Sequence, residues 1–144
     1  MPRAVRDLVV HAPQQLVWEL LADPHHLPRW WPATERVEGV DRDRWTQVFV
    51  TRRGKPVRAD YQLVASEPPW RRCWRQEIAA TPFERVLSES ITEVTLEPVH
   101  GGTRVTLAQQ QKLRGYSRTG GYLLRRATTQ KLKDALSGLE SICA

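Results

Sequence analysis

The segment "HAPQQLVWELLADPHHLPRWWP" (residues 11–32) decides the fold. Pro13 can occupy the first turn of a helix, and the apolar residues that follow it recur at helical spacing. The residue before a proline avoids the helical conformation, so this helix ends before Pro24. Residues 24–30 then predict a second, short helical segment. Because residues 4–11 alternate in polarity as a strand does, the chain is expected to open with a strand and two short helices.

The middle of the chain predicts a series of strands. Short polar or glycine-containing turns separate these segments, which favours antiparallel neighbours. The longest segment is long enough for one bent or bulged strand. The predicted strands are RVEGV (36–40), RWTQVFVTR (44–52), VRADYQLVAS (57–66), RRCWRQEIA (71–79), TPFERVLSESITEVTLEP (81–98) and TRVTLAQQQKL (103–113).

The last segment, residues 122–144, changes from strand to helix spacing. Its apolar residues recur every three to four positions over about six turns, with Lys131 or Leu132 falling on the same stripe. Thr128 and Thr129 stand where a fully packed helix would carry larger apolar residues. One curved antiparallel sheet against a long C-terminal helix is the simplest way to bury this stripe, which predicts an α+β fold.

Length and composition predict a single domain. The chain has 144 residues, of which 40% are hydrophobic and 26% charged, as is usual for a globular protein. No apolar run approaches the length of a membrane span. The opening residues lack the unbroken apolar core of a signal peptide, so we expect a cytoplasmic protein. Cys73 and Cys143 are then expected to be reduced thiols.

The charge pattern argues against specific nucleic-acid binding. The net charge is +6 and the isoelectric point is about 9.9, but the arginines are scattered as single residues and pairs, with acidic residues between them. This pattern is typical of a solvated surface and not of a polyanion site. Weak attraction to an anionic membrane surface or to an anionic ligand group remains an expectation.

Three segments together resemble a known family. They are "HAPQQLVWELLADPHHLPRWWP", the strand "GGTRVTLAQQQ" (101–111) and the long terminal helix. They resemble the START-like (SRPBCC) helix-grip superfamily, in its polyketide cyclase/dehydrase and lipid transport branch. The resemblance covers the whole chain and implies one domain over residues 1–144. It further implies a seven-stranded sheet wrapped around the terminal helix, with a cavity for an apolar small molecule between them.

The strand alternation indicates which residues would line such a cavity. Glutamines and hydroxyls on otherwise apolar strand faces are suited to orient a ligand in a mostly apolar pocket. One of Trp30 and Trp31 is expected in the core and the other at the cavity mouth. The predicted lining is Trp30, Trp31, Tyr61, Trp74, Gln76, Val86, Ser88, Ser90, Leu107, Gln109, Leu124 and Thr128.

Metal and catalytic motifs are weak in this sequence. His25 and His26 are adjacent, and no HxH, HExxH or CxxC spacing occurs, so we expect neither a metal site nor a cofactor. No GxSxG motif is present. Tyr61, Glu84, Arg126 and Asp60 are candidates for acid–base chemistry, but no catalytic residue can be assigned.

Three functions remain open at this point. The leading hypothesis is binding of a small hydrophobic lipid- or polyketide-like ligand, with transport of that ligand as an extension of it. The first alternative is a polyketide cyclase or dehydratase, which requires a buried ionisable group facing the cavity. The second is a co-chaperone-like interaction module, which would have a filled core and an exposed apolar patch. The sequence does not indicate the oligomeric state.

Overall fold

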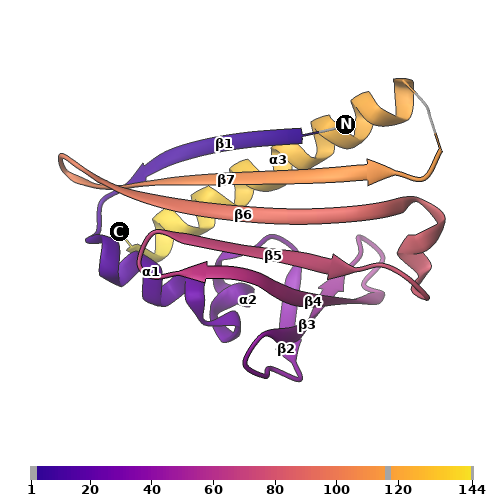
Figure 1. Ribbon diagram of the computed structural model, residues 1–144, viewed down its shortest axis with the longest axis horizontal. Coiled ribbons are helices and arrows are strands. Elements are labelled where there is room, and N and C mark those ends of the chain that lie inside the picture. The colour runs from indigo at the N-terminus through magenta and orange to yellow at the C-terminus, as the bar shows by residue number, and fades with distance from the viewer. Residues whose placement is uncertain (1–2, 116–117, 144) are drawn as a thin grey trace.

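One antiparallel sheet and one long helix make up most of the molecule (Figure 1). The structure is a computed structural model that describes residues 3–115 and 118–143. The elements are β1 (Arg3–Val10), α1 (Gln14–Ala22), η1 (Pro24–His26), α2 (Leu27–Trp30), β2 (Thr34–Glu38), β3 (Arg44–Val50), β4 (Pro56–Glu67), β5 (Arg71–Glu77), η2 (Pro82–Arg85), β6 (Leu87–Val99), β7 (Gly102–Leu113) and α3 (Arg118–Cys143).

The strand order β1-β7-β6-β5-β4-β3-β2 explains the role of the two short helices. Strands from β2 to β7 follow one another as antiparallel neighbours, and β1 pairs with β7. The chain must therefore cross from one sheet edge to the other between β1 and β2, and α1 and α2 make this crossing. In Figure 1, α3 lies across one face of the curved sheet, where it contacts β1 and β7. The predicted helix-grip architecture is confirmed.

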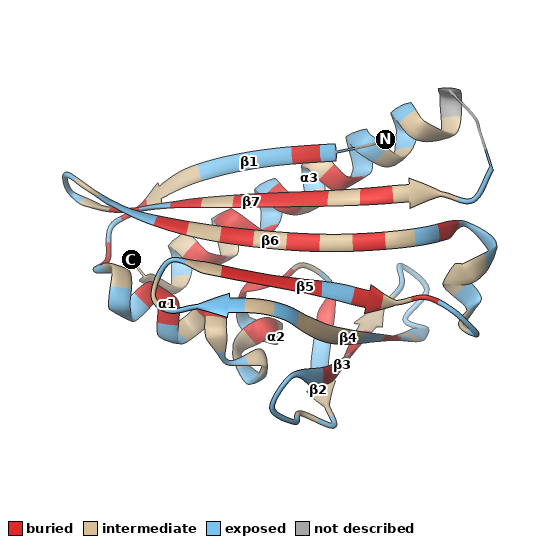
Figure 2. Cartoon of the chain, in the orientation of Figure 1, coloured by how far each residue is buried: buried red, intermediate tan, exposed pale blue. Residues whose placement is uncertain are grey.

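The core lies between this face of the sheet and α3. Buried residues alternate with others along β6 and β7, as the banding in Figure 2 shows. The predicted inner face of β7, which includes Val105 and Leu107, is fully buried. Leu132 and Leu139 on α3 are also fully buried. Burial of apolar surface stabilises the fold by roughly 25 cal/mol per Å², and it is the main force that holds the helix against the sheet.

Gly138 allows α2 and α3 to approach each other closely. A Cβ atom at this position would lie 2.6 Å from the carbonyl oxygen of Trp30. That oxygen belongs to the backbone and cannot rotate away as a flexible side chain could. Glycine is therefore needed here because of contact between two backbones, and not because of an unusual backbone angle.

The long strand predicted over residues 81–98 is shorter in the structure. Pro82–Arg85 form the 3₁₀ helix η2, and β6 begins at Leu87. The pairing of β6 with β7 then shifts register between Leu87 and Glu89, which confirms the expected bulge. Proline fits the first turn of a helix better than a paired strand, and this explains the early part of the segment. The terminal helix, in contrast, begins earlier than predicted, at residue 118 and not at 122.

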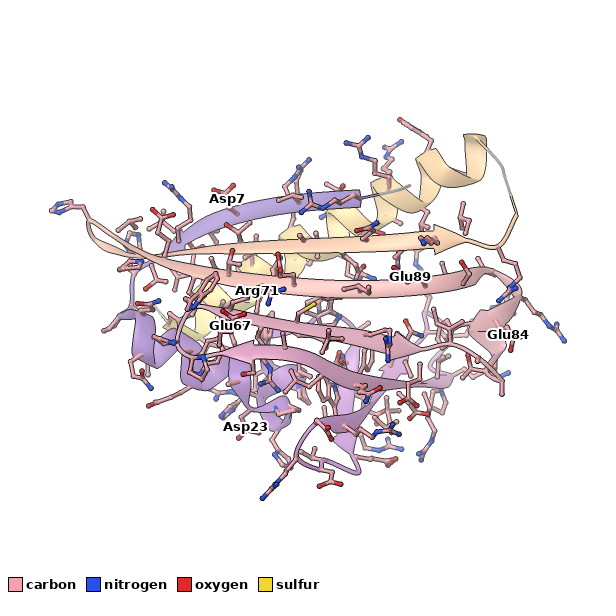
Figure 3. The ribbon with its side chains drawn as sticks, in the orientation of Figure 1. Asp7, Asp23, Glu67, Arg71, Glu84 and Glu89 are labelled. Atoms are coloured by element: carbon pink, nitrogen blue, oxygen red, sulfur yellow. The ribbon has the colours of Figure 1, made fainter. Side chains whose placement is uncertain are left out.

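The outer face of the sheet carries charges that are largely paired. Arg71 on β5 is an example, because it donates to Glu67 at 3.0 Å and to Glu93 at 2.8 Å. Figure 3 shows Glu67 and Arg71 side by side on neighbouring strands. These hydrogen bonds raise the pKa of Arg71. Such local pairing agrees with the solvated surface that the sequence predicted.

Candidate functional site

A pocket of about 560 Å³ lies between the sheet and the middle of α3. Its walls come from the loop after α2, from β3 to β7, from η2, and from one face of α3. The lining residues are Pro32, Ala33, Phe49, Arg52, Val57, Ala59, Tyr61, Gln76, Phe83, Leu87, Gln111, Ala127, Gln130, Lys131 and Asp134.

The sheet side of the pocket is apolar and aromatic. Val57, Ala59 and Tyr61 alternate along β4, so all three point to the same face. The Tyr61 ring stacks on Trp45 of β3, with 5.8 Å between the ring centroids and 15° between the planes. Trp45 in turn meets Trp74 edge to face at 6.1 Å. A packed aromatic cluster therefore holds Tyr61 in place as part of the wall.

Two glutamines place amides on this apolar surface. Gln76 of β5 is buried, and its side-chain nitrogen has no hydrogen-bond partner among the described residues. Gln111 of β7 donates to Ser90 of β6 at 3.3 Å and accepts from Thr128 of α3 at 2.9 Å. Gln111 therefore joins the sheet to the helix, whereas Gln76 lines the pocket with an amide nitrogen that is not paired within the described residues.

Tyr61 and Lys131 are half-buried side chains with titratable groups, and they lie on opposite walls of the pocket. Burial raises the pKa of the Tyr61 phenol, so its hydroxyl stays neutral and can donate a hydrogen bond. Burial also lowers the pKa of the Lys131 amine from 10.5 to about 8, because desolvation disfavours the charged form. Arg52 and Asp134 line the same pocket, and both are exposed at its rim.

Of the predicted lining residues, Tyr61 and Gln76 line this pocket. Ser90, Gln109 and Thr128 are buried but form hydrogen bonds within the protein. Gln109 donates to Thr92 at 2.8 Å, although its side-chain oxygen has no partner among the described residues. Ser90 and Thr128 bind Gln111. These three side chains therefore join strands and helix, and the pocket is lined by their neighbours.

The expected division between Trp30 and Trp31 is wrong. Both side chains are buried in the core cluster, and neither lines the pocket. Their rings meet edge to face at 5.4 Å, and Trp31 meets Trp74 at 6.2 Å. Pro32, the next residue, does line the pocket. The packed rings of Trp30 and Trp31 therefore support the edge of the pocket at Pro32.

The remaining predicted residues lie outside the pocket lining. Leu107 and Trp74 are buried in the core, and Leu124 is half-buried on α3 without reaching the pocket. Val86 and Ser88 are exposed. The predicted register is wrong for these two residues because the bulge turns Leu87 inward in their place.

Several lining residues were missed by the sequence reasoning. Phe83 lies on η2, a 3₁₀ helix that the strand pattern did not predict. Lys131 had a visible signal, because it falls on the apolar stripe of the terminal helix where a lysine is unexpected. Phe49 and Arg52 flank a turn whose position relative to the helix could not be read from periodicity.

The other candidates for acid–base chemistry do not reach the pocket. Asp60 lies on the outer face of β4 and accepts a hydrogen bond from Thr46 at 2.5 Å. Glu84 accepts from the backbone of Ala80 within its own turn. Arg126 is exposed on α3. Within the described residues, no group of three or more His, Cys, Asp or Glu side chains is placed to hold a metal ion.

A second surface feature lies where β1 meets the outer side of α3. Tyr122 and the side chains of Arg6, Arg125, Arg126 and Lys133 surround a hollow of about 420 Å³ there. We refer to the four cationic residues as the basic patch. In the described part of the chain, no helix is long and apolar enough to cross a membrane.

The curved sheet, the enclosed helix and the pocket between them define a helix-grip domain. The family model for polyketide cyclase/dehydrase and lipid transport proteins matches residues 1–143, and the chain belongs to this family. Among curated proteins, no sequence is significantly similar to this chain.

Solved structures with the same fold include aromatase/cyclases. The di-domain ARO/CYC BexL of the BE-7585A biosynthetic pathway is 26% identical, with a TM-score of 0.82. The match covers 98% of this chain and 46% of BexL, so the chain spans less than half of that protein. The Zhui aromatase/cyclase from Streptomyces sp. R1128 is 16% identical, with 98% and 92% coverage and a TM-score of 0.80. TTHA0849 from Thermus thermophilus is 22% identical, with 97% and 95% coverage and a TM-score of 0.73. The similarity to Zhui and to TTHA0849 shows a shared fold alone.

Proposed function

We propose that the chain binds a small, largely apolar, polyketide-like molecule in the pocket between the sheet and α3. The observation that carries this proposal is Gln76, a lining residue of the pocket whose buried amide nitrogen has no partner among the described residues. A buried donor without a partner costs about 1–3 kcal/mol. A ligand oxygen at this position would remove that penalty.

The walls of the pocket support the same proposal. The volume of about 560 Å³ falls within the usual range for small-molecule sites. Phe49, Val57 and Tyr61 would desolvate an apolar or aromatic ligand, while the Gln76 amide and the Tyr61 hydroxyl would orient its oxygens. An oxygen-bearing apolar skeleton is the kind of molecule that the family description names.

Native mass spectrometry of the purified protein, followed by denaturing extraction, is the first test. We expect an added mass that is released as an apolar compound. The substitution Ala127→Trp fills the pocket from an exposed position on α3, and should abolish uptake without unfolding the protein. Leu123→Trp, exposed on the same helix and outside the lining, is the matched control. Equal uptake by both variants would refute binding in this pocket.

A cyclase or dehydratase activity is the second candidate. It is supported by the 26% identity with BexL over nearly the whole chain, and by two titratable side chains, Tyr61 and Lys131, in the pocket. Cyclisation of a poly-β-ketone requires a proton acceptor near an acidic carbon and a donor near a carbonyl. Incubation with a linear poly-β-ketone thioester should then give a cyclised product that has lost water. Release of the unchanged thioester would support binding alone.

The co-chaperone-like interaction module was expected to have a filled core, and the open pocket counts against this alternative.

Weak contact with an anionic membrane surface stays a prediction. The basic patch, together with the exposed Tyr122 and Leu123 on α3, supports it.

A further inference from the structure

Lys131 is a half-buried cation that lines the pocket. It lies on α3, one turn after Ala127, and its side chain faces the wall formed by β3, β4 and β5. Among the described residues, no carboxylate lies within ion-pair distance of its amine. A lysine that is partly withdrawn from water usually has a partner, because its charged group loses hydration. The position therefore offers an unmatched positive charge to whatever enters the pocket.

The charged and titratable neighbours of Lys131 leave this charge unmatched. Asp134 is exposed on the next turn of α3 and accepts a hydrogen bond from Gln130 at 3.0 Å. Tyr61 is neutral, because burial raises the pKa of its phenol. Arg52 adds a second positive charge at the rim. An anion inside the pocket would meet two cations, with one carboxylate at the edge.

We propose that the Lys131 ammonium binds an ionised oxygen of the ligand, so that the pocket selects acidic aromatic or polyketide-type molecules over their neutral analogues. This inference rests on the proposed binding function and specifies its ligand class. The oxygen belongs to a carboxylate, phenolate or enolate, which are the acidic groups that such skeletons carry. The Gln76 amide supplies a second donor from the opposite wall.

Binding of an anion would also offset the desolvation of the lysine. Burial alone lowers the pKa of Lys131 to about 8. An oxyanion in contact with the amine favours its protonated form and raises this pKa again. A bound acid and the ammonium therefore stabilise each other, whereas a neutral ligand leaves the penalty in place.

The test compares 2-naphthoate with methyl 2-naphthoate, which has the same ring system without the charge. Affinities are measured at pH 7 by isothermal titration calorimetry for the wild type, Lys131→Met and Lys133→Met. The wild type should bind 2-naphthoate about 10- to 100-fold more tightly than the ester, as a charged hydrogen bond predicts. Lys131→Met should lose this preference and keep its affinity for the ester. Lys133→Met makes the same change of charge at an exposed site and should retain the preference.

The outcomes separate this inference from the proposed function. If Lys131→Met prefers 2-naphthoate as strongly as the wild type does, anion recognition by Lys131 is wrong while binding in the pocket stands. If neither probe binds the wild type, and no apolar ligand co-purifies, the proposed function itself fails. Lys131→Arg retains the charge and should retain the preference. Unchanged affinity for the ester shows that each variant is folded.

Discussion

Replacing Lys131 by methionine should stabilise the protein at neutral pH. Methionine is a flexible, apolar side chain that can follow the path of the lysine stem. It removes the amine that burial makes costly to protonate. The lowering of the Lys131 pKa from 10.5 to about 8 corresponds to about 3 kcal/mol in the free energy of unfolding. This value is an upper bound, because the lysine is half-buried and its amine can turn toward solvent.

The pH dependence of this gain has a definite sign. The folded chain releases the Lys131 proton near pH 8, whereas the unfolded chain holds it until about pH 10.5. Between these values the unfolded state binds more protons, so the stability of the wild type rises with pH. Below pH 8 the full penalty is present. The advantage of Lys131→Met should therefore be largest at pH 7 and should shrink steadily between pH 8 and pH 10.

Urea denaturation at pH 7 and at pH 10 measures this difference directly. Lys133→Met serves as the control, because Lys133 is exposed and its substitution should change the stability by less than about 0.5 kcal/mol at either pH. The difference between the two variants cancels the titration of all other groups. If Lys131→Met gains no more stability than Lys133→Met, or gains the same amount at both pH values, desolvation of the Lys131 amine is refuted as the cause.

Two further substitutions test contacts that hold α3 in place. Gly138→Ala puts a Cβ atom 2.6 Å from the carbonyl oxygen of Trp30, and should destabilise the protein by about 1–3 kcal/mol. Ser137→Ala, at the exposed neighbouring position, should change the melting temperature little. Gln111→Leu leaves the buried Thr128 hydroxyl without its acceptor, and should cost about 1–3 kcal/mol in urea denaturation. Unchanged midpoints for Gly138→Ala or Gln111→Leu would contradict the corresponding contact.

The fold could be predicted because its periodic signals are strong. The switch from strand alternation to a long helical stripe near residue 120 requires a sheet with one covering helix. The prolines at positions 13 and 24 place the first helix within one residue of its observed ends. The segment over residues 81–98 could not be resolved in the same way, because its alternation carries no sign of where a bulge resets the register.

The pocket could be predicted only in part, because alternation shows which face a residue occupies and not what lies opposite it. Ser90, Gln109 and Thr128 were correctly placed facing inward. The Ser90 and Thr128 hydroxyls and the Gln109 amide nitrogen find partners across β6, β7 and α3, which only the three-dimensional pairing reveals, while the Gln109 side-chain oxygen has no partner among the described residues. Gln76 faces the same way on β5, but its amide nitrogen finds no partner in the described part of the chain. Which of these amide groups are paired, and which of them line the pocket, therefore depends on contacts distant in sequence.

Lys131 links the question of stability to the question of function. An apolar residue at this point of the helical stripe would pack against the sheet wall without the desolvation of a charge. Side chains that lower stability occur where a protein has another use for them, most often at binding and catalytic sites. If Lys131→Met is both more stable and unable to distinguish 2-naphthoate from its ester, the two measurements together assign the lysine to the ligand. A variant that gains stability and still distinguishes the two probes would show that the Lys131 charge lowers stability without recognising the anion.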